Sequence, residues 1–270
     1  MILPYVLRLA DDAIIIGHRL GEWCGHGPIL EQDIALSNAA LDHLGRARSL
    51  YQYAAELFNN MPADAKKDCF TSIALQNLIN AGNSLDEDNL AYLRDGWDYK
   101  NVILTEQPNM DWAYTVARGF FFDGFNFYYF AALAQSTDTT LAAIAEKSLK
   151  EVTYHLRWSS EWVIRLGDGT EESHERMQKA INELWMYTGE LFTPVAYETA
   201  LQQQGIAPDL KLVHEQWTAR ITSVCNEATI VLPTGTWMQQ GGKEGRHSEH
   251  LGYILTELQF MQRAYPGMAW

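Results

Sequence analysis

Residues 30–55, LEQDIALSNAALDHLGRARSLYQYAA, decide the fold. Apolar residues recur there at steps of three and four, and six fall on one stripe: Leu30, Ile34, Leu41, Leu44, Tyr51 and Ala55. This spacing is typical of an amphipathic α-helix, in which 3.6 residues complete a turn. Strand-like alternation is absent from the sequence. We therefore predict an all-α protein.

Four long helices are expected in the first part of the chain. They span 4–24, 30–58, 111–135 and 138–167, with Asp111 and Asp138 as the caps of the third and fourth. The connection over 59–108 is long enough to be a crossover between two helical pairs. Two long pairs joined by a crossover are typical of a ferritin-like four-helix bundle.

Shorter helices are expected after Gly167. Thr170 can cap one, Thr193 with Pro194 can start another that ends at Gly205, and Pro208 can open a third. A Gly-rich loop over 234–247 then precedes a last helix, capped by Ser248 and ended near Pro266. We expect residues 168–270 to pack on the bundle, and the whole of 1–270 to form one domain.

Charge limits the classes of partner. The chain has 34 acidic and 20 basic residues, a formal net charge of −14, which repels phosphate backbones and anionic membranes. The apolar N-terminal stretch is interrupted by Arg8, Asp11 and Asp12, and the aromatic run at 120–130 by Asp123. Neither stretch is therefore a signal peptide or a membrane span. We expect a soluble, cytoplasmic protein with no nucleic-acid partner.

A ferritin-like bundle invites a search for a di-iron site. Such sites use a Glu from each of two helices and a Glu-x-x-His motif from each of the other two, because residues at i and i+3 point together into the core. The literal matches are Glu171 with His174 and Glu244 with His247. Neither pair lies in a long core helix, so both are interpreted as solvated surface.

Within the long helices the ligand positions are only partly filled. His155 stands at a ligand position in the fourth helix, but Val152 replaces the acid three residues earlier, and Asp123 lies 32 residues upstream. In the second helix, His43 and Arg46 take the places of the Glu and the His. Arginine cannot coordinate a metal, because it is cationic and has no available lone pair.

Asp12, on the first helix, is the upstream acid assigned to His43 and Arg46. Together with Arg46, Asp123 and His155, it favours a charge-paired polar network rather than a two-metal cage, since charges in a bundle core need partners. One alternative remains open. Glu151 and His155, spaced i to i+4, could bind a single metal with an acid from another helix.

Several motifs in one order resemble the PaaC family, the C subunits of the bacterial phenylacetyl-CoA epoxidase (ring 1,2-phenylacetyl-CoA monooxygenase). The matching stretches are RLGEWCGHGP at 19–28, DIAL at 33–36, Asn38, LD at 41–42, LG at 44–45, KE at 150–151, YHLR at 154–157, MQKAIN at 177–182, GGK at 241–243, Gly245, His247 and EHLG at 249–252. The resemblance covers nearly the whole chain and is weakest at 59–84.

The resemblance implies a ferritin-like structural subunit of a multicomponent oxygenase. In that family a catalytic A subunit holds the di-iron centre and epoxidises the ring of phenylacetyl-CoA with O₂. A B subunit bridges, and an iron–sulfur flavoprotein reductase supplies electrons from NADPH. No catalytic residue and no cofactor are then expected in this chain. A homodimer of the chain alone stays open.

The Gly-rich loop brings together the cations Lys243 and Arg246 with His247 in an otherwise acidic chain. These residues could meet a phosphate of coenzyme A or a carboxylate of a partner subunit. The interpretation as a solvated loop stands beside this one. Two further functions therefore remain as alternatives to the structural subunit, namely a free-standing metal oxidase and a subunit that presents a CoA thioester.

Overall fold

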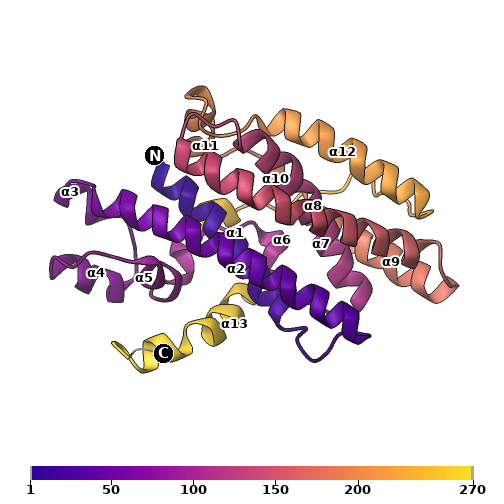
Figure 1. Ribbon diagram of the computed structural model, residues 1–270, viewed down its shortest axis with the longest axis horizontal. Helices are drawn as coiled ribbons and strands as arrows, with labels where there is room; N and C mark the ends of the chain where they lie inside the picture. The colour runs from indigo at the N-terminus through magenta and orange to yellow at the C-terminus, as the bar shows by residue number, and fades with distance from the viewer. Residues whose placement is uncertain (1, 269–270) are drawn as a thin grey trace. The chain divides into compact units, whose positions relative to one another are not determined.

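The structure, a computed structural model, describes residues 2–268, and these residues form helices with no strand among them (Figure 1). The helices of eight or more residues are α1 (Ile2–Gly21), α2 (Leu30–Asn59), α4 (Ile73–Asn80), α7 (Trp112–Leu133), α8 (Thr139–Gly167), α9 (Glu171–Leu184), α11 (Ala196–Gln203), α12 (Leu210–Glu227) and α13 (Glu249–Leu258). The shorter ones are α3 (Ala63–Lys66), α5 (Glu87–Tyr92), α6 (Ile103–Glu106), α10 (Gly189–Phe192), α14 (Phe260–Ala264) and the 3₁₀ helices η1 (Gly96–Asp98), η2 (Trp185–Tyr187) and η3 (Gly242–Glu244).

The four long helices α1, α2, α7 and α8 confirm the prediction to within a few residues. Three predicted caps are also confirmed. Asp111 accepts the Tyr114 N–H at 2.8 Å, Asp138 accepts the Leu141 N–H at 2.9 Å, and Thr170 accepts the Ser173 N–H at 3.2 Å. Each cap satisfies a backbone donor that the first helical turn leaves without a partner.

The predicted boundaries are wrong in two later helices. The helix expected from Thr193 begins at Ala196 instead, after Val195 in an extended conformation. The last helix stops at Leu258 rather than near Pro266, and a short helix follows it. At this break Gln259 is buried, and its Nε2 donates to the carbonyl of Arg94 at 2.9 Å, which fixes the break by a contact distant in sequence.

The chain divides into two compact units. The first contains the residues up to Val102 and those from Gly241 onward, and in it α1 packs along α2 while α5 lies against α2 and α13 against α1. The second, Ile103–Gln240, contains the α7/α8 pair with α9 and α12 against it. Within 168–270, α13 is thus in the unit of α1, and α9 and α12 are in the other unit, while the packing of 168–270 on the bundle stays a prediction. The single domain over 1–270 stays a prediction.

The apolar stripe of α2 does not coincide with its buried face. Tyr51 and Ala55 are buried, but Leu30, Ile34, Leu41 and Leu44 are exposed, while the side facing α1 buries Leu36, Ala40, Ala47 and Leu50. Close packing of α1 on α2 explains part of this arrangement. A Cβ added to Gly17 of α1 would lie 3.2 Å from the Cβ of His43, so the two helices meet along the small-residue side of α2.

Among residues 2–268, no helix has both the length and the apolar character that crossing a bilayer requires.

Candidate functional site

The sequence assigned six positions to a degenerate di-iron site, and all six are buried, none more than 6% exposed. They are Asp12 on α1, His43 and Arg46 on α2, Asp123 on α7, and Val152 and His155 on α8. By contrast, Glu151 next to Val152 is only half-buried. The prediction that these six positions face the core is therefore confirmed.

In the first unit, Asp12 is held by groups that already supply its counter-charge. Arg8, one turn earlier on α1, places its Nε 3.4 Å from the Asp12 carboxylate, and the Val102 N–H donates to it at 2.8 Å. Burial raises the pKa of Asp12 to about 6, while the charges of Arg8 and Lys243 and the bond from Val102 lower it. Asp12 thus has two fixed cations beside it.

Lys243 reaches this interior from the Gly-rich loop, where it was expected to be available to a partner. It is 1% exposed, so it offers no surface cation here, and its contact with a partner or with coenzyme A stays a prediction. The glycines make the burial possible. Gly245 has φ +88°, and a Cβ there would lie 2.6 Å from the Trp97 carbonyl oxygen, so the loop presses closely against the chain at Trp97.

The other two residues predicted in this loop have local partners. Arg246 is exposed and forms an ion pair with Glu244 at 2.9 Å. His247 is half-buried, and its Nε2 lies 2.9 Å from the carbonyl oxygen of Tyr99. Contact of Arg246 and His247 with a partner or with coenzyme A stays a prediction.

A second buried acid, Asp11, forms a network that the sequence did not reveal. Its carboxylate accepts the Arg94 guanidinium, with Nη1 at 3.1 Å from Oδ2, and both side chains are fully buried. The Tyr51 hydroxyl donates to Oδ1 at 2.6 Å and the Lys100 N–H donates to Oδ2 at 2.8 Å. Two adjacent acids in an apolar first helix were the available signal, but Arg94 lies 83 residues away in the chain.

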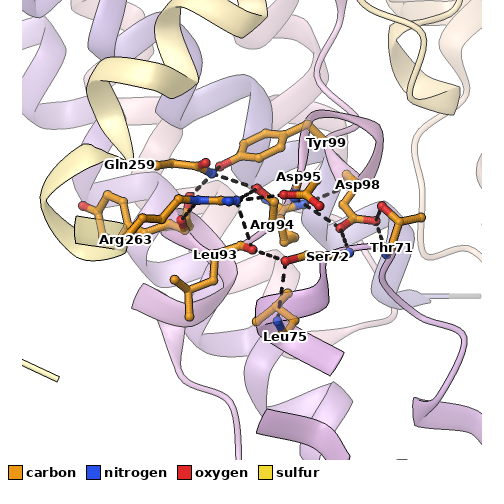
Figure 2. Close-up of polar contacts among 12 residues, drawn as sticks. Thr71, Ser72, Leu75, Leu93, Arg94, Asp95, Asp98, Tyr99, Gln259 and Arg263 are labelled. Atoms are coloured by element: carbon orange, nitrogen blue, oxygen red, sulfur yellow. Dashed lines mark hydrogen bonds and ion pairs between the residues drawn. The ribbon is translucent and has the colours of Figure 1, made fainter. Parts of the chain in front are cut away.

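Figure 2 shows how the surrounding polar contacts hold Arg94 in place. Asp98 accepts the backbone N–H of Thr71 at 2.6 Å, which ties the segment just before α4 to the end of η1. Gln259 donates to the Arg94 carbonyl, and Arg263 donates to the same carbonyl at 2.8 Å. The crossover and the break between α13 and α14 therefore share one hydrogen-bonded layer.

Beside this layer lies a cavity of about 720 Å³. Leu251 and Leu255 are among its lining residues, and the exposed aromatic side chains of Trp97 and Phe260 also border it. Its lining includes Arg263, whose guanidinium already binds backbone carbonyls and Asp95 at 3.0 Å. The cavity therefore offers apolar surface rather than an uncommitted cation for a phosphate.

In the second unit, the ligand pair on α8 is broken as predicted. Val152 is fully buried at the position of the acid and has no donor atom. One carboxylate oxygen of Asp123 on α7 lies within 4.8 Å of a ring nitrogen of His155. This pair of helices thus brings one carboxylate and one imidazole together, where a di-iron bundle would bring two carboxylates and an imidazole.

Both literal Glu-x-x-His pairs lie outside the long helices, as predicted. Glu171 is exposed in the first turn of α9, and His174 is bonded through Nδ1 to the Gly167 carbonyl at 2.7 Å. Glu244 is exposed and paired with Arg246. These carboxylates are therefore on the surface, and His174 has a structural partner.

The match to known proteins runs along the whole chain. The phenylacetic acid catabolic protein family matches residues 1–270. The chain belongs to this family. The C subunit of the 1,2-phenylacetyl-CoA epoxidase of Escherichia coli (strain K12) is 44% identical over 266 residues, which cover 98% of each chain. The resemblance seen in the sequence and the all-α, ferritin-like fold are thereby confirmed.

The donor set of this phenylacetic acid catabolic protein does not fit a di-iron centre. Arg46 and Val152 supply no ligand atom, and the Asp12 carboxylate already forms an ion pair with Arg8. The remaining donors, His43, Asp123 and His155, are too few for the carboxylate-rich sets that hold two irons in ferritin-like proteins. The six positions therefore do not supply a complete set of di-iron ligands among residues 2–268.

Proposed function

We propose that the chain is the non-catalytic structural subunit of a phenylacetyl-CoA 1,2-epoxidase in aerobic phenylacetate degradation. It pairs with and stabilises a catalytic A subunit, which holds the di-iron centre, while a B subunit bridges and a reductase supplies electrons. The observation that carries the proposal is the buried ion pair of Asp12 with Arg8, at 3.4 Å. The 44% identity to the C subunit of such an epoxidase supports the assignment to this complex.

The physical argument is that fixed cations supply, beside buried carboxylates, the positive charge that a metal supplies in a catalytic bundle. Buried carboxylates are costly unless a positive charge lies beside them. Arg8 supplies it for Asp12, and Arg94 supplies it for Asp11. A bundle stabilised in this way keeps its helix pairs without iron and remains able to bind a related subunit.

Co-expression tests the proposal. The A subunit from the same organism is produced with and without this chain, and epoxidation of phenylacetyl-CoA is measured with the B subunit and the reductase added. We expect the A subunit to be stable and active only when this chain is present, and this chain to have no activity alone. Turnover by the isolated chain, or full activity of the A subunit without it, would overturn the proposal.

The two alternative functions have less support in the geometry. A CoA-presenting subunit needs surface cations, but Lys243 is buried, Arg246 is paired with Glu244, and Arg263 is bound to carbonyls and Asp95. A free-standing oxidase needs ligands that Val152 and Arg46 do not provide. Affinity of the isolated chain for phenylacetyl-CoA measures the first alternative, and its metal content measures the second.

A further inference from the structure

The N-terminal half of α2 carries a row of large apolar side chains on its surface. We define the α2 stripe as Leu30, Ile34, Leu41 and Leu44, which are between 39% and 71% exposed. Their spacing of four, seven and three residues keeps them on one side of the helix. Single exposed apolar residues are normal on proteins, but a row of four along one helix marks an interaction surface.

An adjacent face of α2, about a quarter-turn away from the stripe, packs against α1. Leu36, Ala40 and Ala47 are buried on that face, where α1 packs along α2. Of the stripe residues, Leu44 lies at the edge of the α1–α2 contact, 3.4 Å from a Cβ placed on Gly17, while Leu30, Ile34 and Leu41 are each at least 50% exposed. In the described part of the chain the stripe remains on the surface.

On the C-terminal half of α2, the side that continues the stripe is polar. There the outer side bears Arg48 and Gln52, which bind Glu87 of α5 at 3.3 Å and 2.9 Å. The side of α2 is thus polar where α5 meets it and apolar where it is exposed. If the exposed part of this side contacted only water, polar residues would be expected there instead of apolar ones. An apolar row of this kind suits a helix of another subunit, packed ridge into groove.

We infer that the α2 stripe is the surface on which the catalytic A subunit docks, an inference that rests on the proposed function. Charge argues against a second copy of this chain, because two copies would each bring a net charge of −14. Glu31 is exposed and Asp42 half-exposed beside the stripe. The surface therefore fits a partner helix with an apolar face and basic residues along its edges.

The test compares two double variants of the full chain. Ile34→Asp with Leu41→Asp places two charges in the stripe, while Ile73→Asp with Leu212→Asp places two at exposed apolar positions on α4 and α12. Because all four positions are exposed, both variants should keep the helical signal and melting temperature of the wild type. Binding to the purified A subunit is measured by titration and by co-elution in size-exclusion chromatography.

We expect the stripe variant to bind the A subunit at least about 100-fold more weakly, since two apolar anchors are replaced by charges. The control variant should bind like the wild type. If the stripe variant also binds like the wild type, the stripe is not the docking surface, although the proposed function stands. If the wild type itself does not bind, the proposed function fails and the inference falls with it.

A third outcome concerns which protein binds the α2 stripe. If the isolated wild type is a dimer, the stripe variant is a monomer, and both bind the A subunit equally, then the stripe serves a second copy of this chain. That result would overturn the inference about the partner. Sedimentation of the isolated wild type and stripe variant provides this measurement.

Discussion

The guanidinium of Arg8 lies 3.4 Å from the carboxylate of Asp12, one turn apart on α1, with both side chains buried. Lys243 adds a second positive charge from a loop that is far away in the sequence. This arrangement places positive charge near the Asp12 carboxylate with side chains of the protein itself. Such a pairing suits a subunit that keeps the bundle fold while its partner carries the metal.

The raised pKa of Asp12 gives a pH-dependent stability. Its pKa rises from 3.8 to about 6 on folding, so the folded state binds this proton more tightly than the unfolded state, and the group's contribution is lost as pH rises through 6. Between pH 5 and pH 8 this amounts to about 1.4 kcal/mol. Asp12→Asn should lack that part of the dependence.

Urea denaturation of the wild type and Asp12→Asn at both pH values measures this effect. The free-energy difference between the two proteins should shift in favour of Asn toward pH 8. The loss of the Arg8–Asp12 contact affects the variant equally at both pH values, so the shift with pH is the informative quantity. A difference that does not change with pH would show that Asp12 does not titrate as described.

Removing Arg94 should be strongly destabilising. Arg94→Met leaves the Asp11 carboxylate buried without its cation, which costs about 3–5 kcal/mol in comparable cases. Adding Asp11→Asn should recover part of the loss, because the stranded charge is then absent. Chemical denaturation of the wild type, both single variants and the double variant gives the coupling between the two residues.

The matched control for Arg94 is Arg48→Met. Arg48 pairs with Glu87 but is largely exposed, so its loss should cost less than about 1 kcal/mol. Equal effects of Arg48→Met and Arg94→Met would contradict the importance given to the buried pair.

The Gly-rich loop should tolerate no side chain at Gly245. Its φ of +88° is strained for alanine, and the added Cβ would lie 2.6 Å from the Trp97 carbonyl oxygen. Gly245→Ala should therefore lower the melting temperature more than Gly235→Ala, which has φ +69° and open space around the Cβ. Calorimetry of the two variants separates the clash from the conformational strain common to both, and equal losses would refute the close contact.

The sequence predicted what depends on local chemistry. Asp111, Asp138 and Thr170 were identified as caps because a cap needs only a side chain and the next turn of helix. The burial of His43 and His155 followed from helical phase. These features require no knowledge of which helices meet.

The sequence did not predict what depends on distant contacts. Arg94 meets Asp11 across 83 residues, and Lys243 is buried although its loop composition suggested a surface site. The exposure of the α2 stripe could not be predicted either, because periodicity shows that a helix has an apolar side but not which partner covers it. Here α1 packs on the side that carries Ala40 and Ala47, and the stripe remains exposed.

Iron content per chain is the most direct test of the claim that this protein replaces metal with fixed cations. The chain is purified alone and together with the A subunit, and iron is measured by elemental analysis on the same size-exclusion peaks. We predict iron near zero for the chain alone, and iron in the peak where it co-elutes with the A subunit. Two irons per chain in the isolated protein would contradict the account.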